Sequence, residues 1–191
     1  LQKNTETMET ELDRFIEIFQ RVRAEQKIDE LSARISKLSK QQKQIADDIG
    51  FIPEEKIQQL LFKQERNNLE FQRIEQLIEE TSTAIQPYAK MPSEELDALA
   101  NSNLFESINN EMSSTEKSLK KENYSQASST ATLASDKLEL LNDKVGEISK
   151  NFRDQTSNDM EKRIRKILQN SLFISKKQEQ LRRETRELPR N

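Results

Sequence analysis

The sequence of 191 residues lacks cysteine, histidine and tryptophan, and it contains only two glycines. Without cysteine or histidine, the chain cannot form a thiol nucleophile, a Ser-His-Asp triad, the usual zinc sites or the Glu-x-x-His pairs of a di-iron bundle. Gly50 and Gly146 lie far apart, which excludes a glycine-rich phosphate loop. Adjacent acidic residues do occur, but the helix dipole explains those at expected helix starts; the pairs are Glu54-Glu55, Glu79-Glu80 and Glu94-Glu95. We therefore expect no enzymatic activity, no cofactor, no metal site and no small-molecule substrate.

Long apolar segments are also missing from the chain. No run of residues approaches the ~20 apolar positions that a membrane-spanning helix needs. Hydrophobic residues make up 32% of the sequence and charged residues 34%, with a net charge of −3. This composition is poor for the core of a compact globule, but it suits helices that share narrow apolar stripes. Regular apolar spacing and nearly balanced charges argue against disorder.

Apolar residues recur at alternating steps of three and four positions, which is the spacing of α-helices packed in coiled coils. Turn residues and prolines divide this pattern into five expected helices, at approximately 5–49, 54–86, 93–121, 125–152 and 158–187. The sequence thus predicts an all-α fold: an elongated antiparallel helical bundle, or a set of coiled-coil hairpins, forming a single region over residues 1–191.

The expected helix boundaries depend on a few residues. Two prolines predict a rigid, extended connection over residues 87–92, after which Ser93 is expected to cap the third helix. A turn is expected at Glu122-Asn123, and Asn158-Asp159 is expected to precede the last helix. The small residues that begin the fourth helix predict close packing against the third.

The apolar spacing of the first helix changes phase once, near Val22. Before the change, apolar residues lie at Met8, Leu12, Phe15, Phe19 and Val22. After it, they lie at Ala24, Ile28, Leu31, Ile35, Leu38, Ile45 and Ile49, with Gln42 at the one polar position. Such a discontinuity in a heptad pattern is expected to change the supercoil locally.

One segment of the chain occurs twice. Residues 38–45 (Leu-Ser-Lys-Gln-Gln-Lys-Gln-Ile) return as residues 174–181 (Ile-Ser-Lys-Lys-Gln-Glu-Gln-Leu), and the alignment continues as far as Pro53 and Pro189. We predict that one helical module is used twice, with the two terminal helices side by side and both prolines at the same level. The candidate helix-contact residues are Leu38, Gln42, Ile45, Ile174, Gln178 and Leu181. The two glutamines are expected to fix the register of pairing, and their replacement by leucine to raise stability.

Several segments, taken in order, resemble a family. They are residues 13–19 (Asp-Arg-Phe-Ile-Glu-Ile-Phe), 25–29, 38–42, 63–71, 119–123, 167–172 and 175–179. Together they resemble an uncharacterised bacterial family of large proteins, membrane-anchored at the N-terminus, with a long helical, coiled-coil-rich region outside the cytoplasmic membrane. The resemblance implies a location on the periplasmic side of a bacterial membrane and supplies no catalytic residues. Because the chain begins with Leu1 rather than methionine, we expect a fragment of a larger protein whose membrane segments lie outside it.

These observations lead to one main functional expectation and two alternatives. The first is a non-enzymatic scaffold or spacer of the bacterial cell envelope, which contacts protein partner helices or associates with itself. The alternative is a cytosolic coiled-coil adaptor that binds a partner helix. A weaker alternative is association with nucleic acid or an anionic membrane, because residues 161–191 carry ten Lys and Arg against four Asp and Glu. A solvated face, or pairing with the acidic stretch at 91–118, also accounts for that basic segment.

Overall fold

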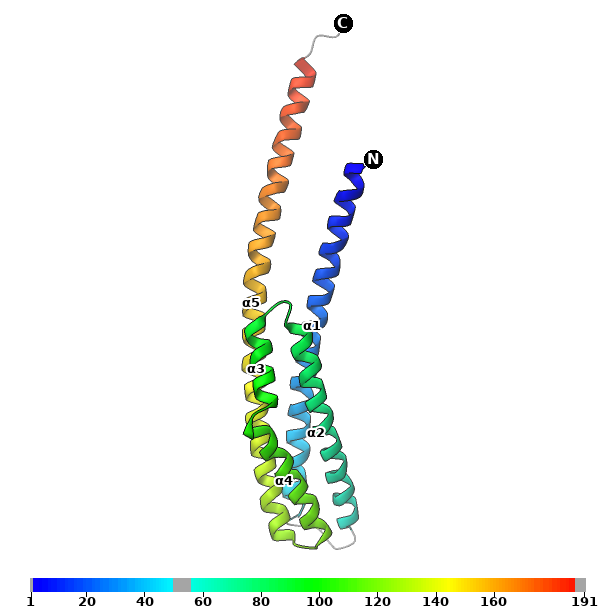
Figure 1. Cartoon of the computed structure of the whole chain (residues 1–191), viewed down its shortest axis with the longest axis vertical. Coiled ribbons are helices and arrows are strands. Elements are labelled where there is room, and N and C mark those ends of the chain that lie inside the picture. Colours follow the sequence, from blue (N-terminus) through cyan, green and yellow to red (C-terminus); the bar gives the residue numbers. More distant parts are fainter. Residues whose placement is uncertain (1, 50–55, 188–191) are drawn as a thin grey trace. The chain divides into compact units, whose positions relative to one another are not determined.

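A computed structural model describes residues 2–49 and 56–187 of the chain, with side chains from residue 16 to 157 within those ranges and at a few positions outside them. The described residues form helices and contain no strand. In chain order the elements are α1 (Gln2–Ile49), α2 (Ile57–Ile85), α3 (Lys90–Ala100), α4 (Asn103–Lys120) and α5 (Tyr124–Glu187) (Figure 1). The predicted all-α helical bundle with five helices is confirmed.

The chain divides into two units, Leu1–Phe152 and Arg153–Asn191. The first unit contains α1 to α4 and the part of α5 that ends at Phe152. The second unit contains the remaining turns of α5, which form a helix up to Glu187. Within the described residues, no helix combines the length and the apolarity that crossing a membrane requires.

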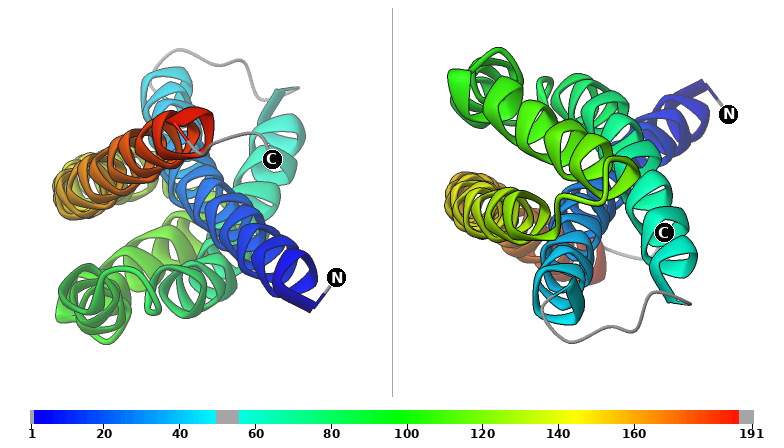
Figure 2. Two further views of the ribbon diagram at one scale, coloured as in Figure 1. Left: turned by 90° about the horizontal axis from the view of Figure 1, so that it is seen from above. Right: turned by 90° about the horizontal axis from the view of Figure 1, so that it is seen from below.

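The first unit has four helical positions in cross-section. α1, α2 and the first part of α5 occupy three of them, and α3 and α4 follow one another along the fourth (Figure 2). α2 runs antiparallel to α1, and α5 runs antiparallel to both α1 and α4 (Figure 1). At ~1.5 Å per residue, the 29 residues of α2 span about 44 Å, so the four positions enclose a long, narrow core.

The core consists of the residues that the apolar spacing predicts. Every apolar position of α1 from Ala24 onward is buried, and so is Gln42. The same holds for the expected stripe of α5 up to Phe152; its members are Ala127, Ala131, Ala134, Leu138, Leu141, Val145, Ile148 and Phe152. Phe71 of α2 and Phe105 of α4 stack between these stripes, with ring centroids 4.5 Å apart.

The expected third helix is two helices in the structure, because the chain breaks at Asn101 and Ser102. The Asn101 Nδ2 atom donates to the Asp97 carbonyl at 2.8 Å, and the Ser102 hydroxyl donates to the Leu99 carbonyl at 2.6 Å. These side-chain bonds compete with the helical backbone bonds. Ser102 is extended, with φ −84° and ψ 154°, and precedes the first residue of α4. The prediction of one continuous helix over 93–121 was therefore wrong.

The connection before α3 is shorter than the prolines suggest. α3 begins at Lys90, which puts Pro92 in its first turn, where a helix needs no backbone N–H. Ala89, not Ser93, precedes the first residue of α3. Ser93 is buried instead, and its hydroxyl lies 2.9 Å from that of Ser82, which links α3 to α2. The predicted extended connection over 87–92 and the predicted cap at Ser93 were both wrong.

A turn lies at Glu122-Asn123, as the sequence predicts. Glu122 has a φ of 58°, in the left-handed region. Its N–H bonds the Leu119 carbonyl at 3.1 Å, and the Asn123 N–H bonds the Ser118 carbonyl at 2.9 Å. This pair of bonds closes a helix in a Schellman motif. The Asn123 Oδ1 atom then accepts from the Gln126 N–H at 3.3 Å and caps α5.

α5 continues through residues 158 and 159, where the sequence predicts a boundary. Neither glycine nor proline lies between residues 147 and 187. Asn158 and Asp159 lower helix propensity by no more than about 0.7 kcal/mol each relative to alanine. The expected helices over 125–152 and 158–187 are thus one helix. The second expected helix starts late, at Ile57, and Glu54 and Glu55 lie outside the described residues.

Candidate interaction sites

A buried layer of polar side chains crosses the core between α1 and α2. Gln42 of α1 is 0% exposed; its Nε2 atom donates to Gln64 Oε1 at 2.8 Å, and its Oε1 atom accepts from Asn67 Nδ2 at 3.1 Å. Gln64 donates in turn to the Met112 carbonyl at 3.3 Å and to Asn68 Oδ1 at 2.8 Å. Gln42, Gln64 and Asn67 are thus hydrogen-bonded although they are buried among apolar residues.

The layer extends to α4 and reaches the surface there. Asn68 donates to Glu116 Oε2 at 2.5 Å, and Glu116 is also bonded to Lys120 at 2.6 Å. A buried polar group without a partner costs about 1–3 kcal/mol, so a sliding of α2 against α1 that separates these groups is penalised. The layer therefore favours one register of the helices, which is the role that the sequence predicts for Gln42.

The two copies of the repeated segment differ in their surroundings. Leu38, Gln42 and Ile45 of the first copy are buried in the core. In the second copy Gln178 is exposed. The side chains of Ile174 and Leu181 lie outside the described residues, as do Pro53 and Pro189. A register-fixing role is thus supported for Gln42 but not for Gln178, and the side-by-side arrangement of the two copies stays a prediction.

α1 and α5 approach each other through small residues spaced seven positions apart. The hydroxyls of Ser39 on α1 and Ser135 on α5 each donate to the other residue's carbonyl at 3.5 Å. Seven residues away on both helices, the Ser128 hydroxyl donates to the Ala46 carbonyl at 3.4 Å. α4 also contacts α5, since Thr115 and Thr130 share a hydrogen bond of 2.9 Å. The small residues at the start of α5 thus permit close approach on two sides.

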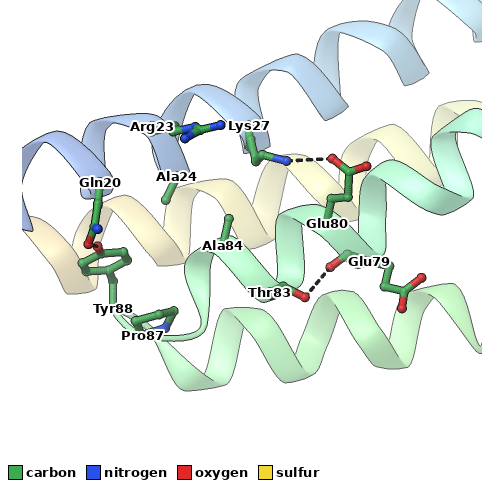
Figure 3. A pocket seen from close by; sticks show the side chains of 10 residues that line it. All are labelled: Gln20, Arg23, Ala24, Lys27, Glu79, Glu80, Thr83, Ala84, Pro87 and Tyr88. Carbon is green, nitrogen blue, oxygen red and sulfur yellow. Dashed lines mark hydrogen bonds and ion pairs between the residues drawn. The ribbon is translucent and has the colours of Figure 1, made fainter.

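A surface groove of about 520 Å³ lies between α1 and the C-terminal end of α2. Its apolar floor comes from Ala24, Ala84 and Pro87, and its rim is polar (Figure 3). The full lining is Gln20, Arg23, Ala24, Lys27, Glu79, Glu80, Thr83, Ala84, Pro87 and Tyr88. The sequence gives no sign of this groove, because its residues come from two helices and no motif joins them.

Charged and polar contacts bridge the two walls of the groove. The Lys27 Nζ atom lies 2.7 Å from Glu80 Oε2, and this hydrogen bond, with the charge of Lys27, holds the pKa of Glu80 below its ordinary value. The Tyr88 hydroxyl donates to Gln20 Oε1 at 3.3 Å. Burial, and secondarily the nearby charge of Glu17, raise the pKa of Tyr88. The groove is thus a rim of paired charges around a small apolar floor, which suits contact with a partner side chain.

Beside the groove, α1 exposes an apolar face at Ile16, Ile18, Phe19 and Val22. These residues are 46, 46, 73 and 44% exposed, respectively. Phe19 and Ile28 are nine residues apart, which at about 100° per residue puts them on opposite sides of the helix. The change of phase near Val22 therefore moves the apolar stripe away from the bundle. The expectation that Phe19 and Val22 belong to the packed seam was wrong for this reason.

No group of three acidic, histidine or cysteine residues in the described part of the chain is arranged to hold a metal ion. The basic residues of 161–170 have side chains outside the described set, so association with nucleic acid stays a prediction. No protein-family model matches the chain, and no curated protein or solved structure matches it either.

Proposed function

We propose that this chain is a non-enzymatic helical scaffold or spacer of the bacterial cell envelope. The observation that carries this proposal is the lengthwise core of the first unit. On α1 it runs without a gap from Ala24 to Ile49, about 38 Å at ~1.5 Å per residue. A core of this form stabilises a fixed length and a fixed alignment of helices, which is what a spacer requires.

The polar layer at Gln42 adds to this support. A spacer whose helices slide has no defined length, and an apolar seam of repeated spacing offers several registers of similar energy. The hydrogen bonds of Gln42 to Gln64 and Asn67 penalise the alternatives. The position in the envelope comes from the family resemblance alone.

Two experiments test the proposal separately. In the first, the full-length gene product is probed with protease in intact cells and in spheroplasts of the source bacterium. An envelope scaffold is cleaved within this region once the outer barrier is opened, whereas protection until the cytoplasmic membrane is lysed would favour the cytosolic adaptor.

In the second, the helices of the first unit are shortened together by whole heptads, with the buried residues kept in phase. Loss of function that follows the shortening, with stability retained, supports the spacer. Retained function would show that length is not what the protein supplies.

A second candidate function is binding of a partner helix, and the exposed apolar face of α1 favours it. Unlike the scattered apolar residues of an ordinary surface, these four lie within seven positions of one helix. A scaffold and an adaptor can both use such a face. Capture of a heterologous helical protein that is lost on Phe19→Glu substitution would favour the adaptor.

A further inference from the structure

The apolar face of α1 at Ile16, Ile18, Phe19 and Val22, named here the outer face, lies opposite the core stripe. On α1 the core stripe starts at Ala24, and the positions that contact other helices of the first unit lie further along. Lys27 and Arg34 pair with α2, and Ser39 and Ala46 meet α5. The helices of the first unit therefore do not cover the outer face.

We propose that the outer face is a self-association surface, on which a second copy of this chain pairs its own α1 in the antiparallel direction. The two-fold axis passes near Glu17. This inference is independent of the proposed scaffold role, since a spacer and an adaptor can each be dimeric.

The sequence around Glu17 is symmetric when read in either direction. Residues 15–19 are Phe-Ile-Glu-Ile-Phe, and Leu12 and Val22 lie five positions to either side of Glu17. In an antiparallel pair centred at residue 17, Phe19 of one copy lies level with position 15 of the other, and Val22 lies level with position 12. A two-fold interface needs a surface that is complementary to itself, and this pattern supplies one.

The charges on either side of Glu17 favour the antiparallel direction. Before Glu17 the sequence carries Glu9, Glu11 and Asp13 against one arginine, and after it Arg21 and Arg23 precede Glu25. Antiparallel pairing brings the acidic half of one helix beside the basic half of the other. Parallel pairing would place like charges together, which costs stability on helix surfaces.

The test compares two phenylalanine substitutions by sedimentation equilibrium of the 191-residue chain. Phe19→Glu changes the outer face, and Phe62→Glu makes the same change at a residue of α2 that is 67% exposed. We expect the parent chain and F62E to sediment at twice the 22.4 kDa of one chain, and F19E at 22.4 kDa. Both side chains are exposed, so circular dichroism should show unchanged helix content in both variants.

A parent chain that stays monomeric at all concentrations would overturn the proposal, and so would equal dissociation of F62E and F19E. Hydrogen exchange of the monomer distinguishes the remaining occupant. Strong protection of residues 16–22 in a monomer would mean that the face is covered within one chain.

Thiol cross-linking tests the direction of pairing, because the chain has no cysteine of its own. Ile18→Cys lies near the proposed axis, and a short bis-maleimide is expected to join two copies through it. Gln26→Cys lies on the same side of α1, level with position 8 of the partner, so its two thiols would be about 27 Å apart along the pair. Efficient cross-linking through residue 26 would indicate parallel pairing and would refute the two-fold arrangement.

Discussion

Replacement of Gln42 by leucine tests whether the buried polar layer is a connected network. The substitution removes the donor to Gln64 Oε1 and the acceptor for Asn67 Nδ2, and both partners are nearly fully buried. Two orphaned polar groups cost about 1–3 kcal/mol each, or about 2–6 kcal/mol together. Burial of a leucine side chain offsets about 1.5–3 kcal/mol of this. We expect Q42L to lower the free energy of unfolding by about 1–3 kcal/mol.

This expectation reverses the sign that the sequence suggests. A lone glutamine in an apolar seam predicts a gain on replacement by leucine, but the structure shows that Gln42 has two buried partners. The triple replacement of Gln42, Gln64 and Asn67 by leucine removes both sides of each bond. It should recover most of the loss or exceed the parent, because an apolar layer of similar volume replaces a satisfied polar one.

The assay is urea unfolding followed by circular dichroism at 222 nm, with the slope and midpoint fitted for each variant. Gln44→Leu is the matched control, because Gln44 lies on the same helix and is exposed. It should change stability by less than about 0.5 kcal/mol. If Q42L is more stable than the parent, or if the triple variant loses more than Q42L, the network reasoning is wrong.

Three further predictions concern the turn, the core and the groove. Glu122→Gly should raise the free energy of unfolding by about 1 kcal/mol in urea, since Glu122 has a φ of 58°, whereas the same change at exposed Glu139 inside α5 should lower it by a similar amount. Leu38→Ala should cost about 2–5 kcal/mol by the same assay, and Leu133→Ala, at 44% exposed, well under that; equal losses would contradict the assigned core. Because the pKa of Glu80 is lowered in the folded chain, its contribution to stability is present above the ordinary value of 4.5 and is lost as the pH falls through the folded pKa. Melting temperatures of E80Q should therefore fall less steeply than those of the parent on acidification below about pH 4.5, and parallel curves would refute the coupling.

The sequence predicts the core of the first unit well because burial there follows a strict period. Steps of three and four positions mark the buried residues of α1 from Ala24 and those of α5 up to Phe152, and both stripes are confirmed. The polar residue Gln42 is also placed correctly. Its partner Asn67 was missed, since an asparagine beside a second asparagine gives no sign of which one faces inward.

The helix boundaries are less predictable because they depend on competing local bonds. Asn101 and Ser102 end α3 through side-chain bonds to the backbone, although their composition differs little from that of polar positions inside helices. Asn158 and Asp159 do not interrupt α5. The same residue types break the helix in one place and continue it in another, so the sequence alone does not distinguish the two cases.

The candidate interaction sites required the structure in different degrees. The change of phase near Val22 is visible in the sequence, but only the burial of Ile28 and the exposure of Phe19 show that the stripe before it leaves the core. The groove beside Tyr88 depends on the packing of α1 against the end of α2, which no local pattern encodes.

Native-state hydrogen exchange of the 191-residue chain tests the central claim most directly, namely that a lengthwise seam on α1, α2 and α5 holds the first unit together as one cooperative body. The account predicts that amides of residues 28–45, 64–82 and 127–148 share the slowest exchange and the same dependence on urea. If α1 instead exchanges at the rate of an isolated helix while α2 remains protected, the seam does not hold the unit together.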